Sequence, residues 1–127
     1  MAKSLILVVE DRPMNAKLLR DVLVASGYEV AETETAEAGL AVARERLPAL
    51  ILMDIQLPGM DGMAAVRELK RDSATAKIPV IAVTASAMPL ERDAILRAGF
   101  DGYQAKPISV KDLLAEVRSL VPPASAD

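Results

Sequence analysis

Five polar side chains of this sequence stand at or just after the ends of expected strands, at the points where the chain would leave a core. They are Glu10, Asp11, Asp54, Thr84 and Lys106. The three carboxylates among them would repel one another if they met, and a hard divalent cation with oxygen ligands would relieve that repulsion. A hydroxyl and an ammonium group can bind the oxygens of an oxyanion. Together these residue types indicate a metal-assisted phosphoryl-transfer site.

The composition limits which residue could accept a phosphoryl group. The 127 residues include no histidine and no cysteine. This excludes an imidazole base, a Ser-His-Asp triad, a thiolate nucleophile and metal sites built on these two residue types. A carboxylate is therefore the expected acceptor. Asp54 is favoured because it stands alone after its apolar run, whereas the adjacent Glu10 and Asp11 suit a metal-binding pair.

Charge and hydropathy exclude several classes of partner. The formal net charge is -3, and 52% of the residues are hydrophobic but only 2% are aromatic. We expect one globular domain with an aliphatic core, and neither a nucleic-acid nor a membrane partner. The first residues lack the apolar stretch of a signal peptide, and no apolar run approaches the roughly 20 residues of a membrane helix. A cytoplasmic location is the natural interpretation.

Alternating strand and helix patterns must position the five polar residues. Strands are expected at 5–9, 28–32, 50–54, 78–83 and 100–105, and helices at 13–26, 35–46, 61–71, from 86 or 87 to 98, and 109–120. This alternation predicts a three-layer, doubly wound α/β fold in which right-handed crossover helices join five parallel strands. The carboxyl ends of such strands share one edge of the sheet, where ligands bind. We expect one domain over 1–121 and a short disordered tail at 122–127.

Four segments resemble the receiver domain of two-component response regulators. They are Val9-Glu10-Asp11, the segment from Leu52 to Gly62, the segment from Pro79 to Ala85, and Lys106-Pro107-Ile108. The similarity covers residues 4–120 and, within the family, is greatest to DivK-type single-domain receivers of cell-cycle and division control. It implies a CheY-like sheet with strand order 2-1-3-4-5. It also implies a stand-alone response regulator that receives its phosphoryl group from a histidine kinase or a histidine phosphotransfer protein.

The same resemblance implies a role for each matched position. Asp54 would be the phosphoacceptor, and Thr84 and Lys106 would bind the phosphoryl oxygens. Mg²⁺ would be the cofactor, with Mn²⁺ able to substitute. The ligands of the ion would be Glu10, Asp11, Asp54 and the backbone carbonyl of Gln56. Slow self-dephosphorylation is expected, but no activity as an enzyme on other substrates.

Further positions would control the signal that the receiver sends. Thr84 and Tyr103 would form a switch, and Gln56 and Ser86 would set the lifetime of the phosphoryl group. The Lys106–Pro107 peptide bond is a candidate for the cis form, as in the family, although a trans bond would also fit the sequence. The signal would leave through a downstream protein that contacts the fourth helix, fifth strand and fifth helix. The protein would be a monomer or a weak dimer.

Two other interpretations remain open. The fold also suits a haloacid-dehalogenase-type phosphatase or a flavodoxin. The former needs a second aspartate where this chain has Gln56, and the latter needs phosphate-cradling glycines and stacking aromatics. A receiver that acts only as an unphosphorylated interaction module is the second interpretation, and the acidic pair and Lys106 argue against it. Arg12 replaces the asparagine that often follows the acidic pair, and Asp61 is expected to be only a turn and helix cap.

Overall fold

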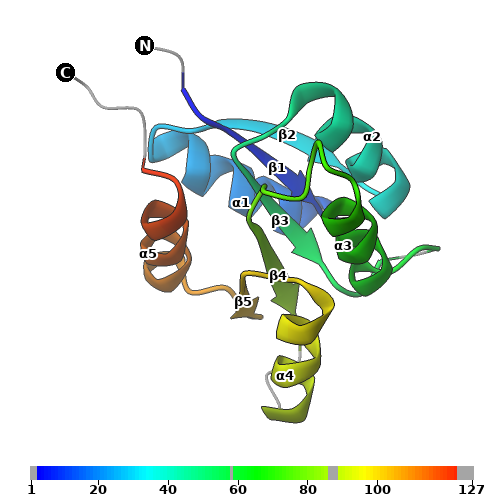
Figure 1. The fold of residues 1–127 in the computed structure, drawn as a ribbon. Coiled ribbons are helices and arrows are strands. Elements are labelled where there is room, and N and C mark those ends of the chain that lie inside the picture. The colour runs from blue at the N-terminus through cyan, green and yellow to red at the C-terminus, as the bar shows by residue number, and fades with distance from the viewer. Residues whose placement is uncertain (1–2, 58, 86–88, 123–127) are drawn as a thin grey trace.

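Strands and helices alternate along the whole described chain (Figure 1). The computed structural model describes residues 3–57, 59–85 and 89–122. The strands are β1 (Leu5–Val9), β2 (Glu29–Thr33), β3 (Leu50–Asp54), β4 (Val80–Thr84) and β5 (Gly102–Ala105). The helices are α1 (Pro13–Ala25), α2 (Ala36–Arg46), α3 (Gly62–Arg71), α4 (Pro89–Ala98) and α5 (Val110–Leu120). The strands pair in parallel in the order β2-β1-β3-β4-β5, which confirms the expected fold.

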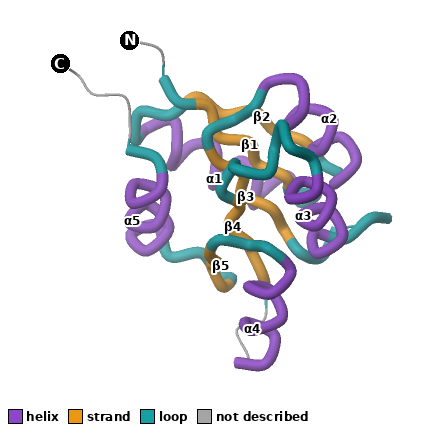
Figure 2. The backbone as a smooth tube through the Cα atoms, viewed as in Figure 1, coloured by secondary structure: helices purple, strands orange, loops and turns teal. Residues whose placement is uncertain are grey.

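The sheet is covered on both faces, so two cores form. Successive residues of a strand point to opposite faces. On one face, alternate residues of β1, β3 and β4 pack with α2, α3 and α4. On the other face, the intervening residues of these strands pack with α1 and α5. Figure 2 shows these two helical layers on either side of the strands. The middle strand β3 is buried throughout, as its uninterrupted apolar run predicts.

Three strands begin one or two residues later than the sequence pattern predicts. The residues just before them either donate their backbone N–H to a preceding helix or have no N–H to donate. The backbone N–H of Tyr28 donates to Leu23 at the end of α1, so β2 begins at Glu29. Phe100 likewise donates its backbone N–H to the end of α4, two residues before β5 begins. Pro79 has no N–H to give to a ladder, and β4 begins immediately after it.

Side-chain caps begin three of the helices. Thr35, Asp61 and Ser109 accept backbone N–H bonds from Ala38, Ala64 and Asp112 at 3.1, 2.8 and 3.3 Å. The prediction that Asp61 is a helix cap is therefore confirmed. Gly27 and Gly99 follow α1 and α4 with positive φ angles of 99° and 121°, as expected for glycine after a helix. The predicted start of the fourth helix, Ser86 or Ala87, lies outside the described residues, and so does the tail beyond Pro122.

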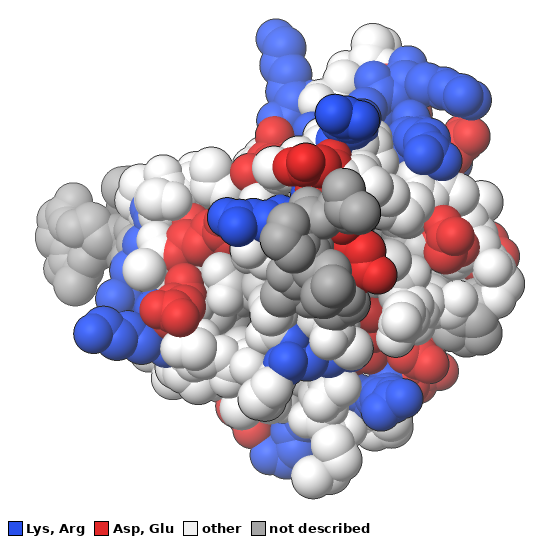
Figure 3. Space-filling model, turned by 90° about the horizontal axis from the view of Figure 1, so that it is seen from below, with Lys and Arg blue, Asp and Glu red and all other residues white. Residues whose placement is uncertain are grey.

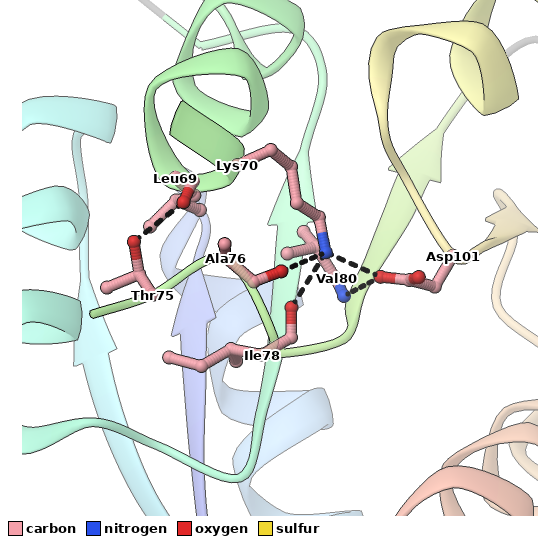
Figure 4. A network of polar contacts seen from close by, with 7 residues as sticks. All are labelled: Leu69, Lys70, Thr75, Ala76, Ile78, Val80 and Asp101. Atoms are coloured by element: carbon pink, nitrogen blue, oxygen red, sulfur yellow. Dashed lines mark hydrogen bonds and ion pairs between the residues drawn. The ribbon is translucent and has the colours of Figure 1, made fainter. Parts of the chain in front are cut away.

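A polar network ties the C-terminal end of α3 to the beginning of β4 and the loop before β5 (Figure 4). Lys70 Nζ donates to the carbonyl oxygens of Ala76 and Ile78 at 3.3 and 3.0 Å and to Asp101 Oδ2 at 3.1 Å. The same carboxylate oxygen accepts the backbone N–H of Val80 at 2.8 Å. One ammonium group thus joins three segments at the amino end of β4. Nothing in the sequence pattern predicted it.

No helix in the described ranges is both long enough and apolar enough to cross a bilayer.

Candidate functional site

The five polar residues singled out from the sequence meet at the carboxyl edge of the sheet. Asp54 and Thr84 are the last residues of β3 and β4, and Glu10 and Lys106 directly follow β1 and β5. Ligand oxygens of Glu10, Asp11 and Asp54 all lie within 4.8 Å of one another. Figure 3 views the side toward which the arrows of β1, β3 and β4 point in Figure 1, and shows acidic and basic side chains interspersed there.

The side chain of Asp54 is held by two donors in a nearly closed environment, with only 3% of the residue exposed. Oδ1 accepts the backbone N–H of Gln56 at 3.0 Å, and Oδ2 accepts a hydrogen bond from Lys106 Nζ at 2.9 Å. The backbone of Gly62 lies close behind. A Cβ at that position would come within 2.6 Å of the Asp54 carbonyl oxygen. The first turn of α3 therefore needs a glycine in order to pack against the strand end.

Lys106 connects two of the carboxylates. Besides its bond to Asp54, Nζ lies 3.3 Å from Glu10 Oε1. The backbone N–H of Lys106 donates to the carbonyl of Thr84 at 2.7 Å, and the peptide bond to Pro107 is cis. Burial alone would lower the pKa of Lys106. The hydrogen bond to Asp54 and the negative charges of Asp54 and Glu10 outweigh burial and raise the pKa of this ammonium group.

Glu10 is the most enclosed acid of the cluster, with 2% of the residue exposed. Its Oε2 accepts the backbone N–H of Arg12 at 3.2 Å, whereas its Oε1 has no hydrogen-bond partner within the described chain. Burial, followed by the contact with Asp54, raises the pKa of the Glu10 carboxyl group. A buried acid that faces two others, and whose Oε1 pairs only with the ammonium group of Lys106 among the described residues, fits a hard cation with oxygen ligands. The donor set therefore fits Mg²⁺.

Thr84 and Tyr103 lie on the same face of the sheet, under α4. Tyr103 pairs with Ala82 of β4, and Thr84 stands two residues further along that strand. Thr84 is buried and borders a cavity of about 230 Å³ that Ile95 of α4 also lines. Tyr103 is half-buried. The guanidinium of Arg92, a residue that the sequence did not single out, lies 4.9 Å from the centre of the tyrosine ring.

The remaining predicted positions lie at the rim. Gln56 is exposed and takes part through its backbone N–H, while Arg12 is exposed at the start of α1. Asp11 is less buried than Glu10 and Asp54. Ser86, expected to affect the lifetime of the phosphoryl group, lies outside the described residues.

This fold and this site define a receiver. Residues 6–118 match the family model described as "response regulator receiver domain", and the chain belongs to this family. It is 45% identical over 119 residues to the polar-differentiation response regulator DivK of Brucella ovis and to that of Brucella anthropi. In both cases the match covers 94% of this chain and 96% of the relative. The similarity to DivK-type receivers is thereby confirmed.

Solved structures agree with this family membership. The receiver domain of a Pseudomonas aeruginosa sensor histidine kinase, crystallised with magnesium coordinated in its active-site cleft, is 33% identical with a TM-score of 0.87, over 94% of this chain and 98% of that one. A CheY-like receiver domain protein of Methanospirillum hungatei is 30% identical with a TM-score of 0.85, over 93% of each chain. Receiver domains bind Mg²⁺ at an acidic site, and they interact with histidine kinases and phosphotransfer proteins. The acidic cluster described above corresponds to such a site.

Proposed function

We propose that this receiver is a phosphorylation switch in which Asp54 accepts a phosphoryl group from a phosphohistidine of a kinase or phosphotransfer protein. An oxygen of Asp54 forms the new bond to phosphorus while the phosphorus–nitrogen bond breaks, and the electron pair of that bond stays on the histidine ring of the donor. The observation that carries the proposal is the contact of Lys106 Nζ with Asp54 Oδ2, at 2.9 Å, inside a cluster of three carboxylates.

The other residues of the cluster have distinct parts in this proposal. Glu10, Asp11, Asp54 and the backbone carbonyl of Gln56 hold Mg²⁺, and Mn²⁺ substitutes for it. When bound, the ion would offset the charge of about -1.5 to -2 that the phosphoryl group carries in place of the single charge of the carboxylate. Lys106 is already placed to move from the carboxylate to a phosphoryl oxygen as a charged donor. The hydroxyl of Thr84, at the adjacent strand end, binds a second phosphoryl oxygen.

The conformational response starts from Thr84. Once its hydroxyl turns toward the phosphoryl group, the ring of Tyr103 moves inward, and the surface of α4, β5 and α5 changes. A downstream protein reads that surface, while the receiver itself remains a monomer or weak dimer in the cytoplasm. Gln56 and Ser86 set the rate of slow self-dephosphorylation. The similarity to the Brucella DivK proteins supports a role in cell-cycle or division control.

Radioactive labelling tests the acceptor. Wild-type protein should incorporate label from acetyl phosphate in the presence of Mg²⁺, and Asp54→Asn should incorporate none. Asp61→Asn is the matched control, because it changes an acid in the next loop that only caps α3. Equal labelling of the wild type and Asp54→Asn would assign the acceptor elsewhere.

A second measurement addresses the interaction-module alternative. Beryllofluoride with Mg²⁺ should bind the wild type and not Asp54→Asn, because it occupies the place of the phosphoryl group. A wild-type protein that neither takes label nor binds beryllofluoride would be an unphosphorylated module. If the wild type does take label, comparing the proteins that co-purify with its phosphorylated form and with Asp54→Asn would identify the downstream partner.

A further inference from the structure

A cation lies against the ring of Tyr103. Arg92 Cζ is 4.9 Å from the ring centre, within the range of a cation–π interaction. Arg92 is exposed on α4, and Tyr103 is half-buried on β5, so the contact joins two elements of the proposed signalling surface. In the part of the chain that the structure describes, no ion pair competes for this guanidinium. Among the described residues, the Tyr103 ring is therefore the partner of the Arg92 guanidinium.

A cavity borders Thr84 on the face of the sheet that Thr84 and Tyr103 share. Tyr103 pairs with Ala82, and the Cα atoms of Tyr103 and Thr84 should lie roughly 8 Å apart, given the spacing of strands and residues in a sheet. The cavity of about 230 Å³ begins at Thr84 and extends to Ile95. Ile95 follows Arg92 by about one turn of α4, so the same helix supplies a wall of the cavity and the cation against the ring.

We propose that Arg92 is a positioning residue that holds Tyr103 in its half-buried place until Thr84 is drawn to the phosphoryl group. The inference rests on the proposed function and adds an energetic restraint to it. An exposed cation–π contact changes the ratio of two conformations by a factor of about two to five. Arg92 therefore biases the unphosphorylated receiver toward its off conformation, and its loss would raise the ratio of inward to outward Tyr103 by that factor.

Fluorine NMR can follow the ring directly, because the chain contains only two tyrosines. Labelling with 3-fluorotyrosine gives two resonances, and the Tyr28→Phe variant assigns them. Spectra are recorded for the wild type, Arg92→Ala and Arg92→Lys, each with and without beryllofluoride and Mg²⁺. Arg97→Ala is the matched control, since Arg97 is an exposed arginine near the end of the same helix for which no ring contact is found among the described residues.

Without beryllofluoride, the Tyr103 resonance of Arg92→Ala should lie closer to the position that the wild type reaches with beryllofluoride. The shift should correspond to a two- to fivefold change in the population ratio. Arg92→Lys should fall between Arg92→Ala and the wild type, because an ammonium group keeps the charge but loses the planar stacking. Arg97→Ala should match the wild type. A thermal unfolding curve for each variant separates a shifted resonance from a partly unfolded protein.

The outcomes separate the two proposals. If beryllofluoride shifts the wild-type Tyr103 resonance but Arg92→Ala without it is identical to the wild type, the role of Arg92 is refuted and the switch remains. An Arg97→Ala spectrum equal to that of Arg92→Ala would also refute it, because any loss of charge on α4 would then suffice. If beryllofluoride binds but leaves the wild-type resonance unmoved, the tyrosine switch fails and the role of Arg92 fails with it. Labelling of Asp54 would still stand.

Discussion

Lys106 Nζ lies 2.9 Å from Asp54 Oδ2, although 52 residues separate the two along the chain. The contact exists because β3 and β5 run parallel and end at the same edge, with β4 between them. Before any phosphoryl group arrives, this lysine compensates buried negative charge. Its removal should therefore affect stability as well as signalling.

Lys106→Met should lower the free energy of unfolding by about 1–3 kcal/mol, because the buried carboxylates of Asp54 and Glu10 lose the charged donor that they share. Mg²⁺ should restore part of the loss. Urea denaturation with and without Mg²⁺ measures both effects. Lys111→Met, an exposed lysine on α5, is the control and should stay within about 0.5 kcal/mol of the wild type. Equal stability of the two variants would mean that solvent, and not Lys106, screens the carboxylates.

Asp11→Asn should have opposite effects in the absence and presence of Mg²⁺. Without the ion, the variant should be more stable than the wild type, since one of three mutually repelling carboxylates has gone. With Mg²⁺ at a hundred times its dissociation constant, the free energy of unfolding of the wild type should rise by about 2.7 kcal/mol. The free energy of unfolding of the variant should rise much less at the same Mg²⁺ concentration. Thermal unfolding across a Mg²⁺ titration measures both, and Asp61→Asn should follow the wild type.

Tyr28 should make stability depend on alkaline pH. Burial raises the pKa of the Tyr28 phenol above its usual value of about 10, and its hydroxyl donates to the Val121 carbonyl at 2.5 Å. The folded state keeps this proton where the unfolded state releases it. The protonated Tyr28 phenol therefore contributes fully to the free energy of unfolding below pH 10. This contribution is lost as pH rises above 10, by at most about 1.4 kcal/mol per pH unit.

Tyr28→Phe should remove this dependence of stability on alkaline pH. It should also lower the free energy of unfolding by about 1 kcal/mol at neutral pH, because the hydrogen bond to Val121 is lost. Denaturation of both proteins between about pH 8 and pH 11 gives the difference, in which the titration of lysines cancels. A constant difference across this range would show that Tyr28 ionises equally in both states.

Lys70→Met should destabilise the protein by about 1–2 kcal/mol. The Lys70 ammonium group donates to two backbone carbonyls and to Asp101. Without it, the Asp101 carboxylate would accept only the backbone N–H of Val80. Phosphorylation of Asp54 should be unchanged, because the network lies at the opposite edge of the sheet. Lys77→Met, at a nearby exposed position, should have no effect. Equal urea midpoints for the two variants would count against the network.

The sequence predicted those features that depend on local pattern and parallel topology. The apolar runs at β1 and β3 marked both strands to the residue, and the polar residues that follow them met at one edge as expected. The starts of β2, β4 and β5 were predicted too early, because buried apolar residues precede the first residue of each of these strands. Tyr28 and Phe100 are buried without belonging to a strand.

Contacts between side chains distant in sequence were not predictable in this way. Arg92 and Lys70 are ordinary helix residues by composition, and their partners Tyr103 and Asp101 lie on other elements. Such pairs leave no periodic signal, because they depend on how two helices sit against β4 and β5. The dual contact of Lys106 with Asp54 and Glu10 was likewise expected only as proximity, not as a shared bond.

Two hydrogen bonds hold the ends of the described chain beside each other. The Tyr28 hydroxyl donates to the carbonyl of Val121, and the neighbouring Glu29 donates its backbone N–H to the carbonyl of Ser4. Both extremities of the described chain are thus anchored at the start of β2, together at the upper left of Figure 1. A fluorophore or an affinity handle attached at residue 3 or residue 122, the first and last described residues, would project from the side remote from Asp54. Receiver immobilised through such a label should therefore still be open to a kinase, and two labels at these positions should report a short, constant separation while the opposite edge changes.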